Sequence, residues 1–467
     1  MQQKNVVVGG GIAGLLAALI MAERHGRDVV VVERELEAGG LLRRFDYGEF
    51  GQFDYGMHNM YETGIAELDE LLFGLLPPDE WQMLTGSQRD LAGVVYNGRV
   101  QHNSPFPDLR HLPPTDLEAC IGAFFTNLDA GRPIVRDNAW EEAESRFGAP
   151  IARLIDEALQ KQFGKPAAEL DSFASYLTTL SRVVLFGEGA FQDLIESSLL
   201  RGRLAWPEQR SLPAKWESGR KAYYPKKYGI YRVIDALLSR LAAANVEVLT
   251  SAQVNAIDVQ RDRVQAVEII QGKALRTIDN VGHFVWTSGL PPIAKLLGAA
   301  DPNMRFDPPR RTVIVNLLLK EPPAMGDLYY LYCYERGCRT FRVTNFSGYC
   351  ENAPRSGGWP IAVELLLDAP LPSKEEMRQI ALDELRLFGV IQSEELVMFS
   401  AVEELTSGFP MPSVLNFTGL TEIRSRLQNL GLSNLKLLGV MAADKVFFQR
   451  DVLAHTWNTF NNGAKHA

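Results

Sequence analysis

The stretch VVVGGGIAGLLAALIMAERHGRDVVVVERE, residues 6–35, begins almost at the start of the 467-residue chain. Its three valines predict a short buried strand, and Gly9, Gly11 and Gly14 follow in the pattern G-x-G-x-x-G. In this pattern the first glycine allows a tight turn, the second lets the backbone approach a pyrophosphate, and the third lets helix and strand pack closely. The stretch is therefore typical of a dinucleotide-binding turn.

The residues after the turn complete a strand-helix-strand unit. Residues 15–26 predict a helix that ends at Gly26, and the amides at its start would face the phosphates. Residues 28–35, DVVVVERE, predict a second buried strand that runs to Glu33. A carboxylate about twenty residues beyond the glycines is placed to accept hydrogen bonds from an adenosine ribose. Because all of these parts occur in order, the pattern indicates dinucleotide binding and not a glycine turn that serves packing alone.

Two segments downstream favour FAD over NAD. Residues 37–45, EAGGLLRRF, contain a Gly-Gly pair, and residues 51–64, GQFDYGMHNMYETG, follow shortly after it. On these residues the sequence resembles the flavoprotein superfamily of amine oxidases, protoporphyrinogen oxidase, phytoene desaturases and UDP-galactopyranose mutase. In that superfamily a D-x-G-x-H-like segment lies beside the flavin, and residues 54–58, DYGMH, match it. The superfamily has arginine or asparagine after the Gly-Gly pair, where this chain has Leu41, with Arg43 and Arg44 slightly downstream.

The resemblance implies an α/β fold in which a Rossmann-like FAD-binding domain is assembled from separated segments. Residues 215–300 predict a helix, a strand near Val248, a hairpin and a small-residue turn at Thr287, and the C-terminal piece predicts a strand ending at Gly439 and a helix beginning near Asp451. We expect residues 1–70, 215–300 and 406–467 to form the FAD domain. Residues 71–110 and 301–405 would form a substrate-binding mixed sheet, and residues 111–214 a helical cap.

The same resemblance implies which residues hold the FAD, through main-chain or side-chain contacts. They are Gly9, Gly11, Ile12, Ala13, Gly14, Glu33, Arg34, Gly40, Leu41, Leu42, Gly56, Met57, His58, Val254, Thr287, Gly439, Asp451 and Val452.

Two residues are candidates on the substrate side. His58 lies in the segment expected near the flavin ring, where it would donate a hydrogen bond, orient the substrate, or only hold its own loop. Arg342, in TFRVTNFSG, would anchor a carboxylate or diphosphate through its planar fork, unless it is solvated or ion-paired. The run Tyr329, Tyr330, Tyr332 and Tyr334 would wall a pocket or pack within a sheet, with one pair facing inward by strand alternation.

These features leave two functional classes. The first is an FAD-dependent oxidoreductase that transfers hydride from a small-molecule substrate to flavin, and the second is a sugar-nucleotide isomerase that uses reduced flavin without net redox. The isomerase would need arginines that grip a diphosphate, for which Arg310, Arg311 and Arg342 are candidates. An anionic or nucleotide-linked substrate is therefore one alternative. The sequence contains no G-x-S-x-G, H-E-x-x-H or P-loop pattern to support a hydrolase or kinase.

Charge, apolar runs and cysteine positions indicate which partners and which cellular location to expect. A net charge of −9 argues against a nucleic-acid partner, because phosphate binding needs a basic surface. The sequence lacks the long apolar run of a transmembrane span and the pattern of a signal peptide, so we expect a cytoplasmic protein. The four cysteines form no CxxC pair and have no histidine nearby, so we expect no metal site and reduced structural thiols.

Overall fold

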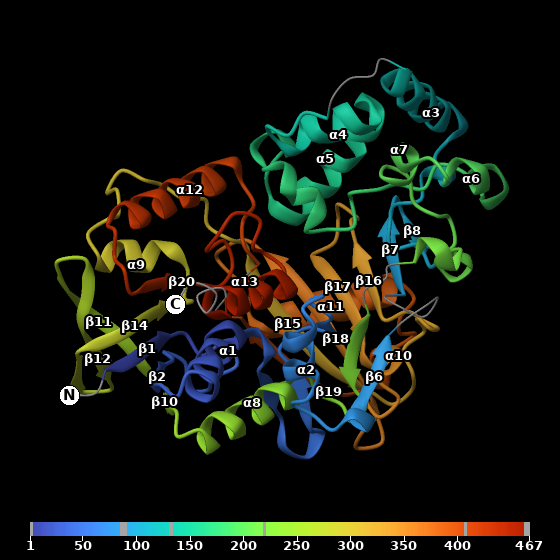
Figure 1. Cartoon of the computed structure of the whole chain (residues 1–467). Helices are drawn as coiled ribbons and strands as arrows, with labels where there is room; N and C mark the ends of the chain where they lie inside the picture. The colour runs from blue at the N-terminus through green and yellow to red at the C-terminus, as the bar shows by residue number, and fades with distance from the viewer. Residues whose placement is uncertain (1–2, 85–90, 130–133, 218–220, 406–408, 462–467) are drawn as a thin grey trace.

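A parallel sheet of five strands forms the first part of the molecule (Figure 1). The computed structural model describes residues 3–84, 91–129, 134–217, 221–405 and 409–461. The sheet has the order β10-β2-β1-β14-β20, with β1 (Lys4–Val8), β2 (Asp28–Val32), β10 (Glu247–Leu249), β14 (Val281–Trp286) and β20 (Leu435–Leu437). Three stretches far apart in sequence thus build one Rossmann-like sheet, and the predicted fold class is confirmed.

Both faces of this sheet are covered, which explains its unbroken valine runs. Val7, Val29 and Val31 point to a core shared with α1 (Ile12–Leu19) and α8 (Tyr231–Ala243). Val6 and Val8 point to the opposite core. That second core includes side chains from the antiparallel strands β11 (Ala252–Gln260), β12 (Arg263–Gln271) and β13 (Ala274–Asp279) and from the helices α9 (Leu290–Leu296) and α12 (Val414–Asn429). The predicted hairpin after Val248 is therefore a three-stranded sheet.

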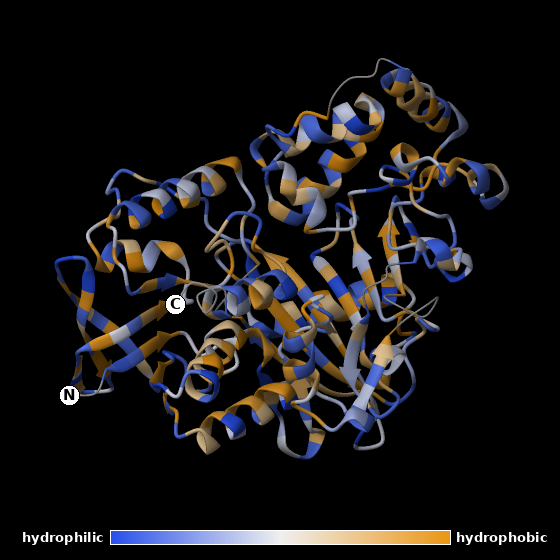
Figure 2. Cartoon of the chain, viewed as in Figure 1, coloured by the Kyte–Doolittle hydropathy of each residue, from blue (hydrophilic) through white to orange (hydrophobic). Residues whose placement is uncertain are grey.

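A second, seven-stranded sheet has the order β19-β15-β18-β17-β16-β7-β8. Its strands are β7 (Ala92–Tyr96), β8 (Arg99–Gln101), β15 (Arg311–Leu319), β16 (Tyr330–Cys333), β17 (Thr340–Asn345), β18 (Trp359–Leu367) and β19 (Val397–Glu404). The β16–β7 pair is parallel and the others are antiparallel, so the sheet is mixed as predicted. The helix α11 (Lys374–Leu387) contacts β15 and β19, and Ser373 and Glu376 form a capping box at its start. Figure 2 shows apolar residues concentrated on the strands of this sheet.

Two small sheets complete the strand pairings among the described residues. The first pairs β3 (Arg44–Asp46) with β4 (Gln52–Asp54). The second joins β5 (Met60–Tyr61), β9 (Ala222–Pro225) and β6 (Trp81–Leu84), so β6 pairs with a strand of the predicted FAD domain although residues 71–110 were expected in the mixed sheet. The short helix α2 (Ala66–Phe73) lies between β5 and β6 in sequence, and α10 (Phe346–Tyr349) lies between β17 and β18.

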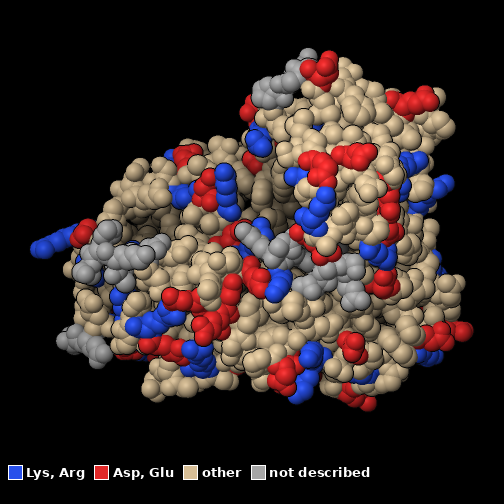
Figure 3. All heavy atoms as spheres, turned by 45° about the vertical axis from the view of Figure 1, so that its right-hand side comes forward, with Lys and Arg blue, Asp and Glu red and all other residues tan. Residues whose placement is uncertain are grey.

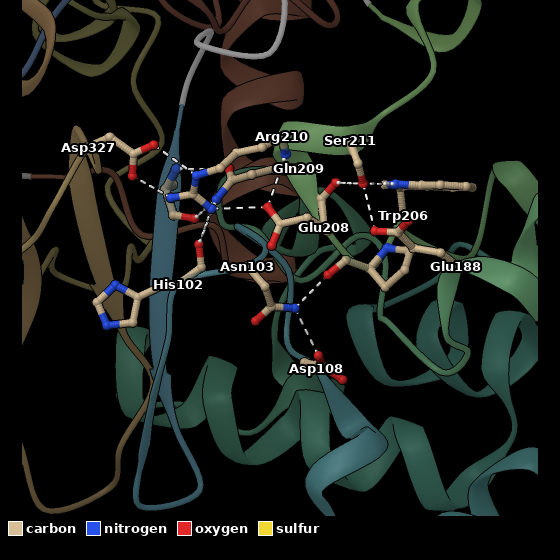
Figure 4. A network of polar contacts seen from close by, with 12 residues as sticks. His102, Asn103, Asp108, Glu188, Trp206, Glu208, Gln209, Arg210, Ser211 and Asp327 are labelled. Atoms are coloured by element: carbon tan, nitrogen blue, oxygen red, sulfur yellow. Dashed lines mark hydrogen bonds and ion pairs between the residues drawn. The ribbon is translucent and has the colours of Figure 1, made fainter.

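The helices between Pro114 and Arg201 form a helical lobe (Figure 1), within the residues 111–214 for which a helical cap was expected. It contains α3 (Pro114–Asp129), α4 (Ala139–Phe147), α5 (Ala149–Phe163), α6 (Glu188–Leu194) and α7 (Ser198–Arg201), with their own apolar core. The chain that leaves α7 is fixed to the large sheet by the polar network of Figure 4. In this network Arg210 pairs with Asp327 and Glu208, and Gln209 exchanges hydrogen bonds with the backbone of Ala92.

Among the described residues, no helix combines the length and the apolar character needed to cross a bilayer. The four cysteines are buried as free thiols. Within the same described ranges, no three histidine, cysteine, aspartate or glutamate side chains are grouped closely enough to hold a metal ion.

Candidate functional site

The glycine turn lies where the carboxyl ends of three parallel strands meet. The amide of Gly9 donates to Val32 O at 2.8 Å, and a Cβ on Gly9 would lie 2.2 Å from Thr287 Oγ1. A Cβ on Gly14 would lie 1.9 Å from Gly9 O, and one on Gly439 would lie 3.0 Å from Thr287 O. Only glycine fits at these contacts, and the backbones that follow β1, β14 and β20 are therefore brought together at one edge of the sheet.

The Gly-Gly pair packs directly on this turn. The amide of Gly39 donates to Gly10 O at 2.7 Å, and a Cβ on Gly40 would lie 3.1 Å from Gly11 Cα. Arg43 then folds back, with Nε donating to Gly40 O at 3.0 Å and the guanidinium 4.7 Å from the centre of the Tyr55 ring. Arg43 therefore places its positive charge at this turn. The sequence alone did not show which contacts Arg43 and Arg44 make.

The two residues between Gly40 and Arg43 differ in what they offer a ligand. The Leu41 side chain is 45% exposed, whereas the Leu42 side chain is 2% exposed and belongs to the core. Of the two predicted cofactor contacts, Leu42 can supply only its backbone.

Glu33 lies beside the turn as the spacing predicts. Its Oε2 accepts a hydrogen bond from Gly10 N at 2.6 Å, and its Oε1 accepts one from Glu35 N at 2.9 Å. Each carboxylate oxygen has a further lone pair, so both can still accept from hydroxyl groups. The amide of Ala252 donates to Glu33 O at 2.8 Å, which places the start of β11, and with it half-buried Val254, close to Glu33. Arg34, by contrast, is largely exposed and pairs with Glu35.

Two helices begin at this edge. The helix α1 has Gly11 as its N-cap without a side-chain hydrogen bond, and α13 (Gln449–Asn461) carries Asp451 in its first turn. Ala13 of α1 packs with Val446 and with Val452 of α13 in one small apolar cluster. The residues after Gly439 and those after the glycine turn therefore converge. Uncapped amides and the positive ends of helix dipoles favour anionic groups such as a pyrophosphate.

This edge fits an FAD by its donor set. A Cβ on Gly11 would meet nothing nearer than Gly40 Cα at 3.9 Å, so the backbone is open to close approach at the position where the pattern expects a pyrophosphate. The buried carboxylate of Glu33 offers acceptors for ribose hydroxyls beside it.

His58 lies opposite the large sheet. Its Nδ1 is 3.4 Å from Gly56 O, and a Cβ on Gly56 would be 3.7 Å from Ile314 Cδ1 and 3.8 Å from Glu364 Oε1. Strand register sets Ile314, Glu364, Arg342 and Tyr332 in one row across β15, β18, β17 and β16. The segment of residues 54–58 therefore faces this row.

Arg342 is held in an ion pair within the row. Its Nη2 donates to Glu364 Oε1 at 2.7 Å and Oε2 at 2.9 Å, and its Nε donates to Oε1 at 3.1 Å. Burial is the largest single effect and opposes the charge, but the charges and hydrogen bonds of Glu364 and Tyr332 together outweigh it and raise the pKa of Arg342. Burial, with a smaller contribution from Arg342, lowers the pKa of His58 to about 4. The charge of Arg342 therefore acts on His58, whose imidazole is neutral at neutral pH. The guanidinium of Arg342 remains charged, and the carboxylate of Glu364 balances that charge.

The other two candidate arginines do not join them. Arg310 forms a two-bond pair with Asp368 and donates to the carbonyl groups of Lys161 and Gln162. Arg311 forms an ion pair with Glu404. Each of the three candidate arginines therefore has its own carboxylate.

The tyrosine run differs from its prediction. Tyr330, Tyr332 and Tyr334 share one face, with ring centres 5.4 Å and 6.5 Å apart, because their positions have the same parity. Tyr329 lies on the other side against Tyr349. The expectation that one pair faces inward is wrong, since three of the four share a face.

A buried acid that the sequence analysis did not single out fixes the segment at His58. Asp54 is fully buried, and its Oδ2 accepts from Tyr224 OH at 2.5 Å while its Oδ1 accepts from Ile230 N at 3.0 Å. The amide of Asp54 donates to Tyr228 OH at 3.0 Å. Burial raises the pKa of Asp54 to about 7, against the opposing effects of these donors and of Arg355. The partners come from β9 and the start of α8, about 170 residues away, so no local pattern could reveal them.

The surface is hollowed between the helical lobe and the lobe that contains the five-stranded sheet, the proposed dinucleotide-binding lobe (Figure 3). Acidic and basic side chains are interspersed on the face shown in that view. Nearby, Phe173 of the helical lobe contacts Phe417, Phe447 and Phe448 of the dinucleotide-binding lobe.

Comparison with known proteins agrees with this geometry. Residues 7–71 match the family model described as an NAD(P)-binding Rossmann-like domain. Comparison with curated protein sequences finds no match.

Solved structures give likenesses over the whole chain. A reduced UDP-galactopyranose mutase has a TM-score of 0.77 at 18% identity, covering 100% of this chain and 95% of that one. A protein assigned as a protoporphyrinogen oxidase from Exiguobacterium sp. 255-15 has a TM-score of 0.71 at 16% identity, covering 100% of both chains. Cyclohexylamine oxidase from Brevibacterium oxydans IH-35A has a TM-score of 0.60 at 16% identity, again covering 100% of both chains. The chain therefore shares its overall fold with these three structures, and residues 7–71 form a Rossmann-like unit, as the glycine pattern predicts.

Proposed function

We propose that the protein is an FAD-dependent oxidoreductase that transfers hydride from a small-molecule substrate to flavin. The observation that carries the proposal is the pairing of Arg310, Arg311 and Arg342 with three separate carboxylates. A sugar-nucleotide isomerase needs cations free to grip a diphosphate, whereas hydride transfer requires mainly position and a suitable electrostatic environment. The segment that carries His58 faces a row of side chains in which the charges of Arg342 and Glu364 balance each other. This arrangement suits hydride transfer better than the binding of a diphosphate.

Each part of the site has a role in this proposal. The amides at the starts of α1 and α13 would hold the pyrophosphate and stabilise negative charge, and Glu33 would accept hydrogen bonds from the ribose. Bound FAD would supply the hydride acceptor. The face that carries Tyr332, Arg342 and Glu364 would orient the substrate and exclude water.

An anaerobic experiment tests the proposal. The cofactor is first released by heat and identified by mass, since recovery of NAD alone would contradict the proposed FAD. The yellow protein is then mixed with candidate substrates without oxygen while the flavin absorbance is followed. Bleaching by a substrate supports the oxidoreductase. Turnover of a sugar nucleotide only after dithionite reduction would instead support the isomerase, the second candidate, which the fold likeness to UDP-galactopyranose mutase keeps in view.

Arg342 provides a prediction about the substrate. If its guanidinium binds an anionic substrate group, Arg342→Lys should raise KM about tenfold or more, because an ammonium cannot form the same planar fork. Glu364→Gln should have the opposite effect on KM, because Glu364 competes for the same cation. Steady-state kinetics of both variants, with flavin content as the control, measure this. Unchanged KM in both variants would assign the pair to sheet packing.

A further inference from the structure

A cavity lies at the edge of the five-stranded sheet opposite the glycine turn. It has a volume of about 480 Å³, within the range of about 300–1,000 Å³ that small-molecule sites occupy. Its lining includes Asn5, Asp28, Gly282 and Asn434 at the amino ends of β1, β2, β14 and β20. The carboxyl ends of the same strands carry the proposed FAD site, so the two sites lie on opposite edges of one sheet.

The cations of this cavity lack counter-ions. Arg27 and Arg263 line it, and within the described ranges neither has a carboxylate oxygen within 4.0 Å. The Nη2 of Arg263 donates to Gly282 O at 3.2 Å, and burial lowers the pKa of half-buried Arg27. Asp28, the one acidic residue of the lining, lies 3.7 Å from Lys4. Partly burying a cation without a counter-ion costs free energy, and a bound anion would offset that cost.

His283 lines the same cavity and lies close to its cations. Burial lowers its pKa to about 4, and the positive charges of Arg27, Lys436 and Arg263 lower it further. The chain as a whole carries a net charge of −9, so this positive region is a local feature. Residues 1–2 and 462–467, which lie outside the described ranges, contain no aspartate or glutamate that could neutralise it.

We propose that this cavity binds the phosphate group of a small phosphorylated molecule through Arg27 and Arg263, with His283 beside them. A guanidinium fork matches phosphate oxygens with two parallel hydrogen bonds, and two such forks here come from different strands or strand ends. The volume leaves room for more than an inorganic phosphate. The site is independent of the proposed flavin chemistry.

Calorimetric titration of the FAD-saturated protein tests this proposal, because bound FAD blocks phosphate binding at the glycine turn. Inorganic phosphate and pyrophosphate are compared with chloride at constant ionic strength. We expect saturable binding of pyrophosphate, weakened about tenfold or more in the double variant Arg27→Gln, Arg263→Gln. Arg305→Gln is the matched control, since Arg305 is exposed and donates only to backbone carbonyls.

A second readout follows His283 by NMR, with its signal assigned from His283→Gln. A bound phosphate should raise the pKa of His283, because an anion would offset the surrounding cations. Equal heats and equal pKa values in chloride and pyrophosphate would overturn the proposal, as would undiminished binding in the double variant. The ring of Phe460 lies 6.3 Å from that of His283, close to the end of the chain. Binding of pyrophosphate only to a variant ending at Asn461 would assign the cavity to the chain's own carboxyl end and would also overturn it.

Discussion

His58 shows how burial sets the charge of a single side chain. Burial, with a contribution from Arg342, lowers the pKa of its imidazole from 6.5 to about 4, so the ring is neutral at neutral pH. A neutral imidazole can donate a hydrogen bond to an anionic reduced flavin without acting as a strong base.

We therefore expect His58→Asn to keep FAD, to shift the reduction potential of the flavin and to slow turnover about 10–100-fold, the scale of one hydrogen bond to a charged group. Spectroelectrochemistry and steady-state rates measure these effects. Complete loss of turnover with FAD still bound would show that His58 transfers a proton. The pKa also predicts a stability effect, because a group with a lowered pKa contributes stability above pH 6.5 that is lost as the pH falls toward 4.

Asp54 should make stability depend on pH in the opposite direction to His58. Burial raises the pKa of this carboxyl from 3.8 to about 7, so its contribution to stability is fully present below pH 3.8 and is lost as the pH rises through 7. Asp54→Asn should remove this dependence while an amide oxygen still accepts from Ile230 N. Denaturant unfolding of the apoprotein between pH 5 and pH 8 should then show a flatter profile in the variant, by on the order of a few kcal/mol. A profile identical to that of the parent protein would mean that the donors around Asp54 keep it ionised. Asp46→Asn, at an exposed carboxyl, is the control.

The glycine turn was predictable because its positions are fixed by backbone chemistry. Gly9, Gly14 and Gly439 each occupy a place that a Cβ would fill, and such constraints are visible in one sequence. Glu364 was not predictable as a site residue, and neither were the partners that bury Asp54, because these contacts come from distant segments. A strand pattern shows which residues share a face, and it does not show which strand will lie next to it.

Among the elements, α4 depends on one buried ion pair. Arg146 Nη1 donates to Glu142 Oε1 at 2.7 Å and to Tyr176 OH at 3.0 Å, and Nη2 donates to the carbonyl groups of Ser181 and Gly202. A helix, two loops and a short helical turn of the same lobe are joined through this guanidinium.

Arg146→Ala should destabilise the helical lobe by about 3–5 kcal/mol, because it leaves Glu142 buried and unpaired. Arg153→Ala, at an exposed position of α5, should change stability by less than about 0.5 kcal/mol. Urea unfolding of both variants measures the difference. A double variant with Glu142→Gln should recover part of the loss, and no recovery would show that the carbonyl contacts matter more than the charge pair.

At this scale the sequence predicted a mixed sheet as the second large element, and the structure contains one. It did not predict that β7 pairs in parallel with β16, or that β6 leaves the mixed sheet to pair with β9. Alternation and caps are local signals, whereas strand order depends on which distant apolar faces bury each other.

In the whole molecule, polar contacts and aromatic contacts join the two lobes on either side of the hollow. The amide of Asp171 donates to Pro412 O at 2.8 Å, and Lys165 pairs with Asp307 at 3.1 Å. Phe173 lies 5.2 Å from Phe447 and 5.9 Å from Phe448 between ring centres. Because Phe447 and Phe448 directly precede α13, this cluster connects the helical lobe to the edge that carries the proposed cofactor site.

We expect FAD to protect both lobes from hydrogen exchange, with protection reaching α4 and α5 through Phe173. In Phe173→Ala the dinucleotide-binding lobe should keep its protection by FAD, while α4 and α5 should lose it and exchange about tenfold faster or more, which corresponds to a loss of about 1.4 kcal/mol. Phe125→Ala is the control, because this exposed ring makes its aromatic contacts with Phe124 and Phe186 within the helical lobe. Mass spectrometry of peptic fragments resolves the two lobes. If FAD protects α4 and α5 equally in the parent protein and in Phe173→Ala, the polar contacts at Asp171 and Lys165 are sufficient to couple the lobes, and the aromatic cluster is not needed for it.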